Sequence, residues 1–187
     1  VKLQRPNQAR GVIDALLQQA NAMAFQMLLP GQPINRQILL VPRNDIERLE
    51  KLLAERGTWV LSIRSAANVL RGERQVLAFP DLRPNRTVVR RGEVLARTTL
   101  EGDVRAPEAV RGRLNLLLAA AFARVQRQGT LVDGLQFDAA AFNTLGRDLS
   151  ERPLGQVANL EALALRDADT PDPIVVELRW LHAGRRS

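Results

Sequence analysis

The sequence predicts a mixed α/β fold, in which two pseudo-symmetric repeats of helix–strand–helix–strand–strand share one mixed sheet. Three observations support this prediction. Two long segments carry apolar residues at helical spacing, short apolar runs with strand character follow each of them, and the same order of elements recurs along the chain. The 187 residues are 45% hydrophobic and 25% charged, which is typical of a globular protein. We therefore expect one globular domain built from two repeats, about 1–86 and 87–187.

The first repeat is predicted to place its two helices and three strands, in the order helix, strand, helix, strand, strand, over 8–28, 37–42, 44–57, 59–64 and 75–80. The apolar residues of the first helix recur every three to four positions. Pro30 and Gly31 stop that helix. Asn44 is a favourable N-cap for the second helix, and Gly57 is a favourable residue just beyond its end.

The second repeat is preceded by alternating residues that indicate a strand pair over 87–99, with a tight turn at Arg91 and Gly92. Its helices and strands are then predicted over 107–127, 139–150, 156–160 and 174–181. Pro107 suits the first turn of the long helix. Asp138 suits the N-cap of the shorter one.

Two collinear matches indicate an internal duplication. Residues 9–28 and 110–129 share six of twenty positions, and 44–57 align with 140–153 in the same order. The alternative is that amphipathic helices recur by chance. If the duplication is real, the strand pair before the second repeat lacks a counterpart in the first, where only Val1–Leu3 stand. We therefore expect the missing strand upstream, in a longer chain of which this sequence is a fragment.

Several classes of site are excluded by composition. The chain contains no cysteine and one histidine, His182, which rules out disulfides, thiolate metal sites and histidine-rich metal sites. The sequence has no glycine-rich phosphate loop. It also has no apolar run of the roughly 20 residues that span a bilayer.

Positive charge is concentrated in the middle of the chain. The net charge is +7, and residues 83–127 alone carry 10 basic and 4 acidic side chains. The planar guanidinium group of arginine can donate two hydrogen bonds to one phosphate, so this region predicts contacts with a nucleic-acid backbone. The candidate arginines are Arg83, Arg86, Arg90, Arg91, Arg97, Arg105, Arg111 and Arg113. A solvated basic face, an anionic membrane surface and an acidic protein partner are the alternatives.

Aspartates form the candidate catalytic set for a second hypothesis, a nuclease that uses Mg²⁺ or Mn²⁺. Three lie just before the last strand, and two more lie at strand ends: Asp167, Asp169, Asp172, Asp81 and Asp138. The alternative interpretation is that the first three form a solvated turn and that Asp138 is a helix cap.

Residues 62–102 carry a distinctive order of motifs: an Ala-Asn-Val segment, a Gly-Glu turn, a strand ending Phe-Pro-Asp-Leu, then Arg-Gly-Glu-Val-Leu-Ala. This stretch resembles the C-terminal region of the bacterial domain-of-unknown-function 3084 family. The resemblance implies the globular end of a protein with an N-terminal membrane anchor and a long coiled coil, on the cytoplasmic side of the inner membrane. It assigns no role to any residue and no membrane contact except through an upstream anchor.

Three functions remain open from the sequence. The first is a module that binds nucleic acid, chiefly DNA, through an arginine-rich surface. The second is the Mg²⁺- or Mn²⁺-dependent nuclease. The third is a non-enzymatic scaffold, such as a homodimerisation module at the end of a coiled coil.

Overall fold

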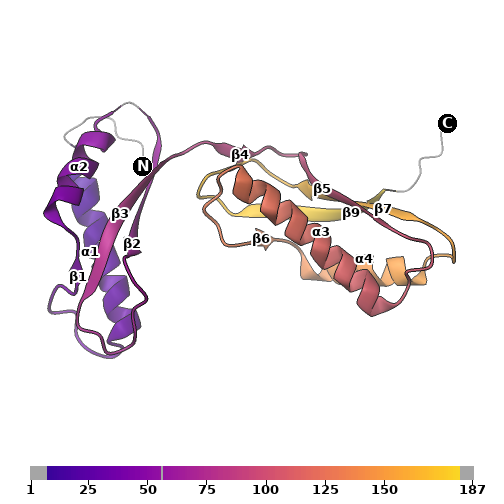
Figure 1. Cartoon of the computed structure of the whole chain (residues 1–187), viewed down its shortest axis with the longest axis horizontal. Coiled ribbons are helices and arrows are strands. Elements are labelled where there is room, and N and C mark those ends of the chain that lie inside the picture. The colour runs from indigo at the N-terminus through magenta and orange to yellow at the C-terminus, as the bar shows by residue number, and fades with distance from the viewer. Residues whose placement is uncertain (1–7, 56, 182–187) are drawn as a thin grey trace. The chain divides into compact units, whose positions relative to one another are not determined.

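A computed structural model describes residues 8–55 and 57–181 of the chain (Figure 1). The chain divides into two compact units, Val1–Asn85 and Arg86–Ser187. Both units combine helices with strands, which confirms the mixed α/β class. The sharing of one sheet by two repeats is not confirmed, because the described strands of each unit pair within that unit. His182 and Val1–Leu3 lie outside the described residues.

The N-terminal unit contains two helices and three strands, namely α1 (Gln8–Leu28), β1 (Leu39–Leu40), α2 (Arg43–Leu53), β2 (Trp59–Ser65) and β3 (Val76–Pro84). The strand order is β1-β3-β2. In this sheet β1 runs parallel to β3, and β2 runs antiparallel to it.

Alternation along β2 and β3 gives this sheet two different faces. Ile63 and Ala78 pack against the cluster around Phe25 of α1, so one face is covered. Leu77 and Phe79 lie on the opposite face and are 57% and 42% exposed. The helices therefore cover one side of the sheet and leave apolar residues on the other.

The C-terminal unit contains two helices and six strands, namely β4 (Thr87–Val89), β5 (Val94–Leu100), α3 (Pro107–Arg127), β6 (Leu135–Gln136), α4 (Ala139–Glu151), β7 (Ala158–Ala164), β8 (Ala168–Asp169) and β9 (Ile174–Leu181). Four strands form a sheet in the order β5-β7-β9-β6, and β4 pairs with β8.

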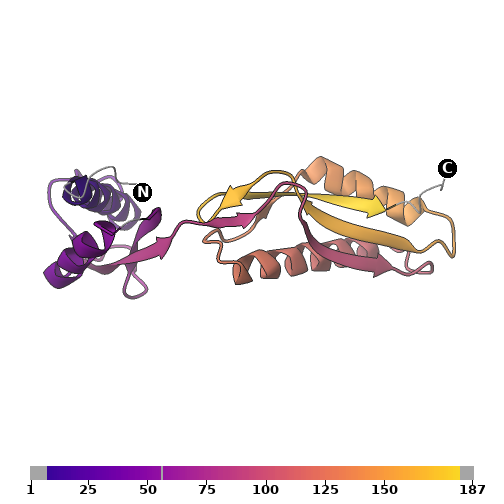
Figure 2. The ribbon, with the colours of Figure 1, turned by 90° about the horizontal axis from the view of Figure 1, so that it is seen from above.

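The two helices of this unit lie side by side on one face of the four-stranded sheet (Figures 1 and 2). Their buried residues share one core with the strands, as Leu114 of α3, Leu149 of α4 and Leu160 of β7 do. Asp138 accepts hydrogen bonds from the backbone N–H groups of Ala140 and Ala141 at 2.7 and 3.1 Å and so caps α4, as the sequence predicted.

The strand pair predicted over 87–99 is not a hairpin. The turn is present, because Glu93 N–H donates to the Arg90 carbonyl at 3.0 Å and Gly92 has a φ of 82°. However, β4 pairs with β8 and β5 pairs with β7. The cause lies in the turn, where Gly92 N–H donates to the Ala164 carbonyl at 2.8 Å and anchors the turn to the end of β7 instead.

The ends of α2 also differ from the prediction. The helix begins at Arg43 after an extended Pro42, so Asn44 lies inside it and is not the N-cap. It ends at Leu53 rather than Gly57. Ala54 N–H donates to the Glu50 carbonyl and Glu55 N–H donates to the Leu52 carbonyl, both at 3.2 Å, and the second of these bonds spans three residues and tightens the last turn.

Candidate functional site

A groove of about 430 Å³ lies between the start of α3 and the second half of α4. This volume is within the range of pockets that hold small ligands. The loop before α3 and the two helices line it with Arg105, Pro107, Arg111, Leu114, Phe142, Asn143, Gly146, Arg147, Ser150 and Glu151.

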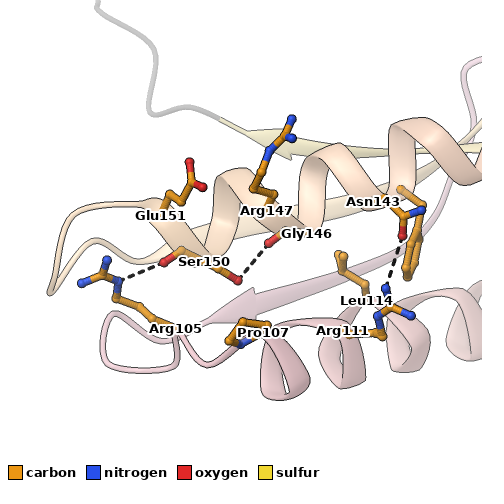
Figure 3. Close-up of a pocket in the computed structure, with 10 residues that line it drawn as sticks. Arg105, Pro107, Arg111, Leu114, Asn143, Gly146, Arg147, Ser150 and Glu151 are labelled. Carbon is orange, nitrogen blue, oxygen red and sulfur yellow. Dashed lines mark hydrogen bonds between the residues drawn. The ribbon is translucent and has the colours of Figure 1, made fainter.

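Helical spacing explains why these residues meet. Pro107 stands at the first helical position of α3, and Arg111 follows one turn later. On α4, Asn143, Gly146 and Ser150 recur at intervals of three and four, so they share one face of the helix. That face points toward α3 (Figure 3).

Two arginines reach across the groove to α4, one from the loop before α3 and one from α3 itself (Figure 3). Arg105 Nε donates to the carbonyl oxygen of Ser150 at 3.2 Å. Arg111 Nη2 donates to Asn143 Oδ1 at 3.3 Å. Arg147 and Glu151 extend from α4 away from α3 in this view, so they border the groove rather than fill it.

Arg152 joins the segments that flank this end of the groove. Its side chain is buried, and the residue is 2% exposed. The guanidinium donates to the carbonyls of Leu149 near the end of α4, of Gln156 in the loop after α4, and of Glu101 and Val104 in the loop before α3. Arg152 thereby holds the loop that carries the groove's first arginine.

Burial lowers the pKa of Arg152, and the neighbouring positive charge of Arg105 lowers it further, while Asp103 raises it. Among the ion pairs of the described residues, none includes Arg105, Arg111 or Arg152. Arg105 and Arg111 of the groove are therefore not neutralised by direct carboxylate contacts, whereas Arg147 at its border pairs with Asp148 at 4.0 Å.

Other arginines predicted as ligands are paired with carboxylates. Arg83 contacts Asp81 at 3.0 Å in the N-terminal unit, and Arg97 contacts Glu161 at 3.5 Å on the sheet of the C-terminal unit. Such pairs lower the net attraction for an external phosphate.

The remaining predicted arginines lie at three other places. Arg86 Nη2 donates to the Gln128 carbonyl at 3.1 Å. Arg90 and Arg91 form the turn between β4 and β5. Arg113 is half-buried on α3. Of the predicted set, the structure therefore brings only Arg105 and Arg111 to the groove.

The candidate aspartates each have a local partner. Asp81 pairs with Arg64 as well as Arg83. Asp167 accepts from Arg91 N–H at 2.6 Å, and Asp169 accepts from the Thr87 hydroxyl at 3.0 Å.

The other two aspartates also accept backbone hydrogen bonds. Asp172 accepts from Asp169 N–H at 2.9 Å, and Asp138 caps α4. Over residues 8–55 and 57–181, no three Asp, Glu, His or Cys side chains are grouped so that they could hold a metal ion.

The sequence did not single out Asn143 and Arg147, which line the groove, or Arg152, which holds the loop beside it. They lie in the last third of the chain, where residues 128–187 carry 6 basic and 9 acidic side chains. Averaging charge over that segment hid two arginines at the end of a helix. Scoring charge by helix face, rather than by segment, would have drawn attention to Arg147 beside the α3 arginines.

Comparison with known proteins assigns the chain to a described family. The family model described as the DUF3084-associated C-terminal helical hairpin matches residues 89–186. The chain belongs to this family. The match confirms the family resemblance found in the sequence, and the two helices inside the matched range are α3 and α4.

A relative of this DUF3084 chain is an uncharacterised protein of Nostoc sp. strain PCC 7120. The two are 34% identical over 179 residues, which cover 94% of this chain and 35% of the relative. The chain thus spans about a third of that relative's length. No solved structure matches it. Within the described residues, no helix is long and apolar enough to cross a membrane.

Proposed function

We propose that this chain is a nucleic-acid-binding module that contacts the phosphate backbone, chiefly of DNA, through the arginines of the α3–α4 groove. The observation that carries the proposal is that Arg105 and Arg111 border the same groove and neither is ion-paired within the described part of the chain. Unpaired guanidinium groups attract phosphate oxygens and release counterions when they bind them.

Both arginines retain donors for a ligand. A guanidinium carries five N–H groups. In the hydrogen bonds of the described residues, Arg105 uses Nε and Arg111 uses one Nη2. The remaining donors of each fork suit a bidentate contact with phosphate.

The composition favours the backbone over the bases as the binding partner. The chain has no tyrosine, five phenylalanines and two tryptophans, so it offers few platforms on which bases could stack. Phosphate contacts position a protein on nucleic acid without reading its sequence. The proposal therefore predicts binding with little sequence preference.

Arg90, Arg91 and Arg113 are further candidates for phosphate contacts, because no ion pair of the described residues includes them. The aspartates have no part in the proposal, since each accepts a hydrogen bond or pairs with an arginine as described above. By family resemblance, the module would act on the cytoplasmic side of the inner membrane, at the end of a membrane-tethered coiled coil.

Fluorescence anisotropy with a labelled DNA duplex at low salt tests this function. Arg105→Ala combined with Arg111→Ala is expected to weaken binding about tenfold, because two phosphate contacts are lost. The matched control is Arg97→Ala combined with Arg124→Ala, which removes the same charge from ion-paired positions. Circular dichroism verifies that both variants fold. Equal losses in the two variants, or no binding by the unaltered chain, would refute the proposal.

A further inference from the structure

The two units share one strand connectivity, although each has its own sheet. In the N-terminal unit the strands that follow α1 are ordered β1-β3-β2, and in the C-terminal unit those that follow α3 and lie in the main sheet are ordered β6-β9-β7. In both, the first strand is parallel to the last, and the middle strand in sequence is antiparallel to the last.

The registers of the parallel strands also correspond. Leu39 and Leu40 of β1 face Val76 and Leu77 of β3. The counterparts in β6 and β9 pair over an equally short stretch of two residues.

The antiparallel strands agree in length. Both β2 and β7 have seven residues. The last residue of each, Ser65 and Ala164, lies opposite the third residue of its partner strand, Ala78 and Val176. Position by position, β2 therefore corresponds to β7.

The two sheets differ in the number of neighbouring strands that the corresponding strands β7 and β2 have. β7 pairs on both sides, with β9 on one and with β5 on the other. β2 pairs with β3 on one side, and no strand in the described residues pairs with its other side. An unpaired edge is a template for another strand, and proteins commonly cover or interrupt such edges.

The hydrogen bonds between β2 and β3 show which backbone donors of β2 face its open edge. Ala66 N–H donates to the Leu77 carbonyl at 2.9 Å, and Asn85 N–H donates to the Thr58 carbonyl at 2.7 Å. In an antiparallel ladder, alternate residues bond to the same neighbour. The even-numbered residues of β2 therefore bond to β3, and the N–H groups of Leu61 and Ile63 point toward the open edge.

We propose that the open edge of β2 binds an antiparallel strand supplied by the polypeptide N-terminal to residue 1. The connectivity of the C-terminal unit identifies this occupant, because β5 directly precedes α3 in sequence and fills the corresponding place beside β7. The same connectivity puts the strand before α1. β5 and its loop occupy residues 94–106, so the strand and its loop would take a similar length of chain before α1.

The side chains of β5 indicate which kind of strand would fit beside β2. Leu95 and Leu100 of β5 are buried in the core. Arg97 and Thr99 are more exposed, and Arg97 pairs with Glu161 on the uncovered face of its sheet. The occupant of the β2 edge is therefore a segment of about seven residues with apolar side chains toward α1 and α2 and polar ones on the other face.

Cysteine crosslinking in the longer polypeptide tests this inference, and this chain has no cysteine to interfere. Ser62→Cys is combined with single cysteines placed one at a time along the segment before residue 1, and disulfides are formed by mild oxidation. Ser62 corresponds to Glu161, which lies opposite Arg97 of β5. Because its N–H is directed to β3, Ser62 would form a non-hydrogen-bonded pair with the new strand. The Cα atoms of such a pair are close enough for a disulfide.

The expected result is crosslinking within one molecule at alternate positions of the preceding segment. With Arg64→Cys in place of Ser62→Cys, the best partner should move toward the N-terminus, as antiparallel pairing requires. Failure of every position to crosslink, a partner that moves the other way, or crosslinks only between two copies would each overturn the proposal.

Hydrogen exchange gives a second measurement without any substitution. The amides of Leu61 and Ile63 should exchange at least about tenfold more slowly in the longer polypeptide than in the 187-residue chain. The amides of Ser62 and Arg64, which bond to β3 in both proteins, are the internal reference. Equal exchange of Leu61 and Ile63 in the two proteins would contradict strand addition.

Discussion

Arg152 donates from Nη2 to the carbonyl oxygen of Val104 at 2.9 Å, which ties the end of α4 to the loop that leads into α3. The same guanidinium also donates to three other carbonyls, although the residue is 2% exposed. The groove between the helices therefore depends on a buried arginine that is satisfied by backbone oxygens rather than by a carboxylate.

Replacing Arg152 with Ala should destabilise the C-terminal unit by about 3 kcal/mol, because several buried carbonyls lose their donor. Urea denaturation followed by circular dichroism measures this change. Arg147→Ala is the matched control, since the Arg147 side chain is 65% exposed and should cost less than about 0.5 kcal/mol. Equal effects of the two changes would show that Arg152 does not hold the loop.

The N-cap of α4 offers a second test. Asp138→Ala should cost about 1 kcal/mol, because the N–H groups of Ala140 and Ala141 lose their acceptor. Asp138→Asn should retain most of the stability, since asparagine caps helices about as well as aspartate. Thermal denaturation distinguishes the two variants. A large loss in the Asn variant would indicate that the negative charge, rather than the cap, is what matters at this position.

Two glycines should respond oppositely to alanine. A Cβ added at Gly102 would lie 2.4 Å from the backbone carbon of Gly155, so Gly102→Ala must displace the backbone and destabilise the unit. Gly112 is inside α3 and a Cβ there meets open space. Gly112→Ala should therefore stabilise the protein by about 0.5–1 kcal/mol. Melting temperatures that shift in the same direction would contradict this interpretation.

Glu93 should make stability depend on acid pH. Burial raises its pKa, but hydrogen bonds from Arg90 N–H and from the Gln128 and Arg124 side chains outweigh that effect and leave the pKa below its usual value. A carboxyl of this kind stabilises the folded state above its unfolded pKa, about 4.3, and this contribution is lost as the pH falls through the lower folded pKa.

The measurement is the urea midpoint as a function of pH for the unaltered chain and Glu93→Gln. The unaltered chain should be the more stable of the two at neutral pH, and the difference should shrink as the pH falls below about 4. A difference that stays constant from neutral to acid pH would show that the charge of Glu93 contributes nothing.

Much of the fold was predictable, because helical periodicity and capping residues are local signals. The bounds of α1 and α3 agree with the prediction, and Asp138 caps α4. Strand pairing was harder to predict from the sequence. The alternation of 87–99 and Gly92 predicted a hairpin, but the competing bonds to Ala164 come from residues distant in sequence.

The groove was only partly predictable. Arg105 and Arg111 stood out because they lie in the basic middle segment. Arg147, which borders the groove, and Arg152, which holds its loop, come from an acidic segment and are brought there only by helix packing. The ion pair between Arg97 and Glu161 depends on the register of β5 and β7, which the sequence does not reveal. The pair between Arg83 and Asp81 is local, because the two residues lie two positions apart on β3.

The most direct test of phosphate binding is the dependence of DNA affinity on salt. For the unaltered chain, a plot of log affinity against log salt concentration should fall steeply. In the Arg105→Ala, Arg111→Ala variant it should be shallower by about 0.9 for each arginine that contacts a phosphate. An affinity independent of salt, or the same slope in both proteins, would contradict the assignment of the α3–α4 groove as the nucleic-acid interface.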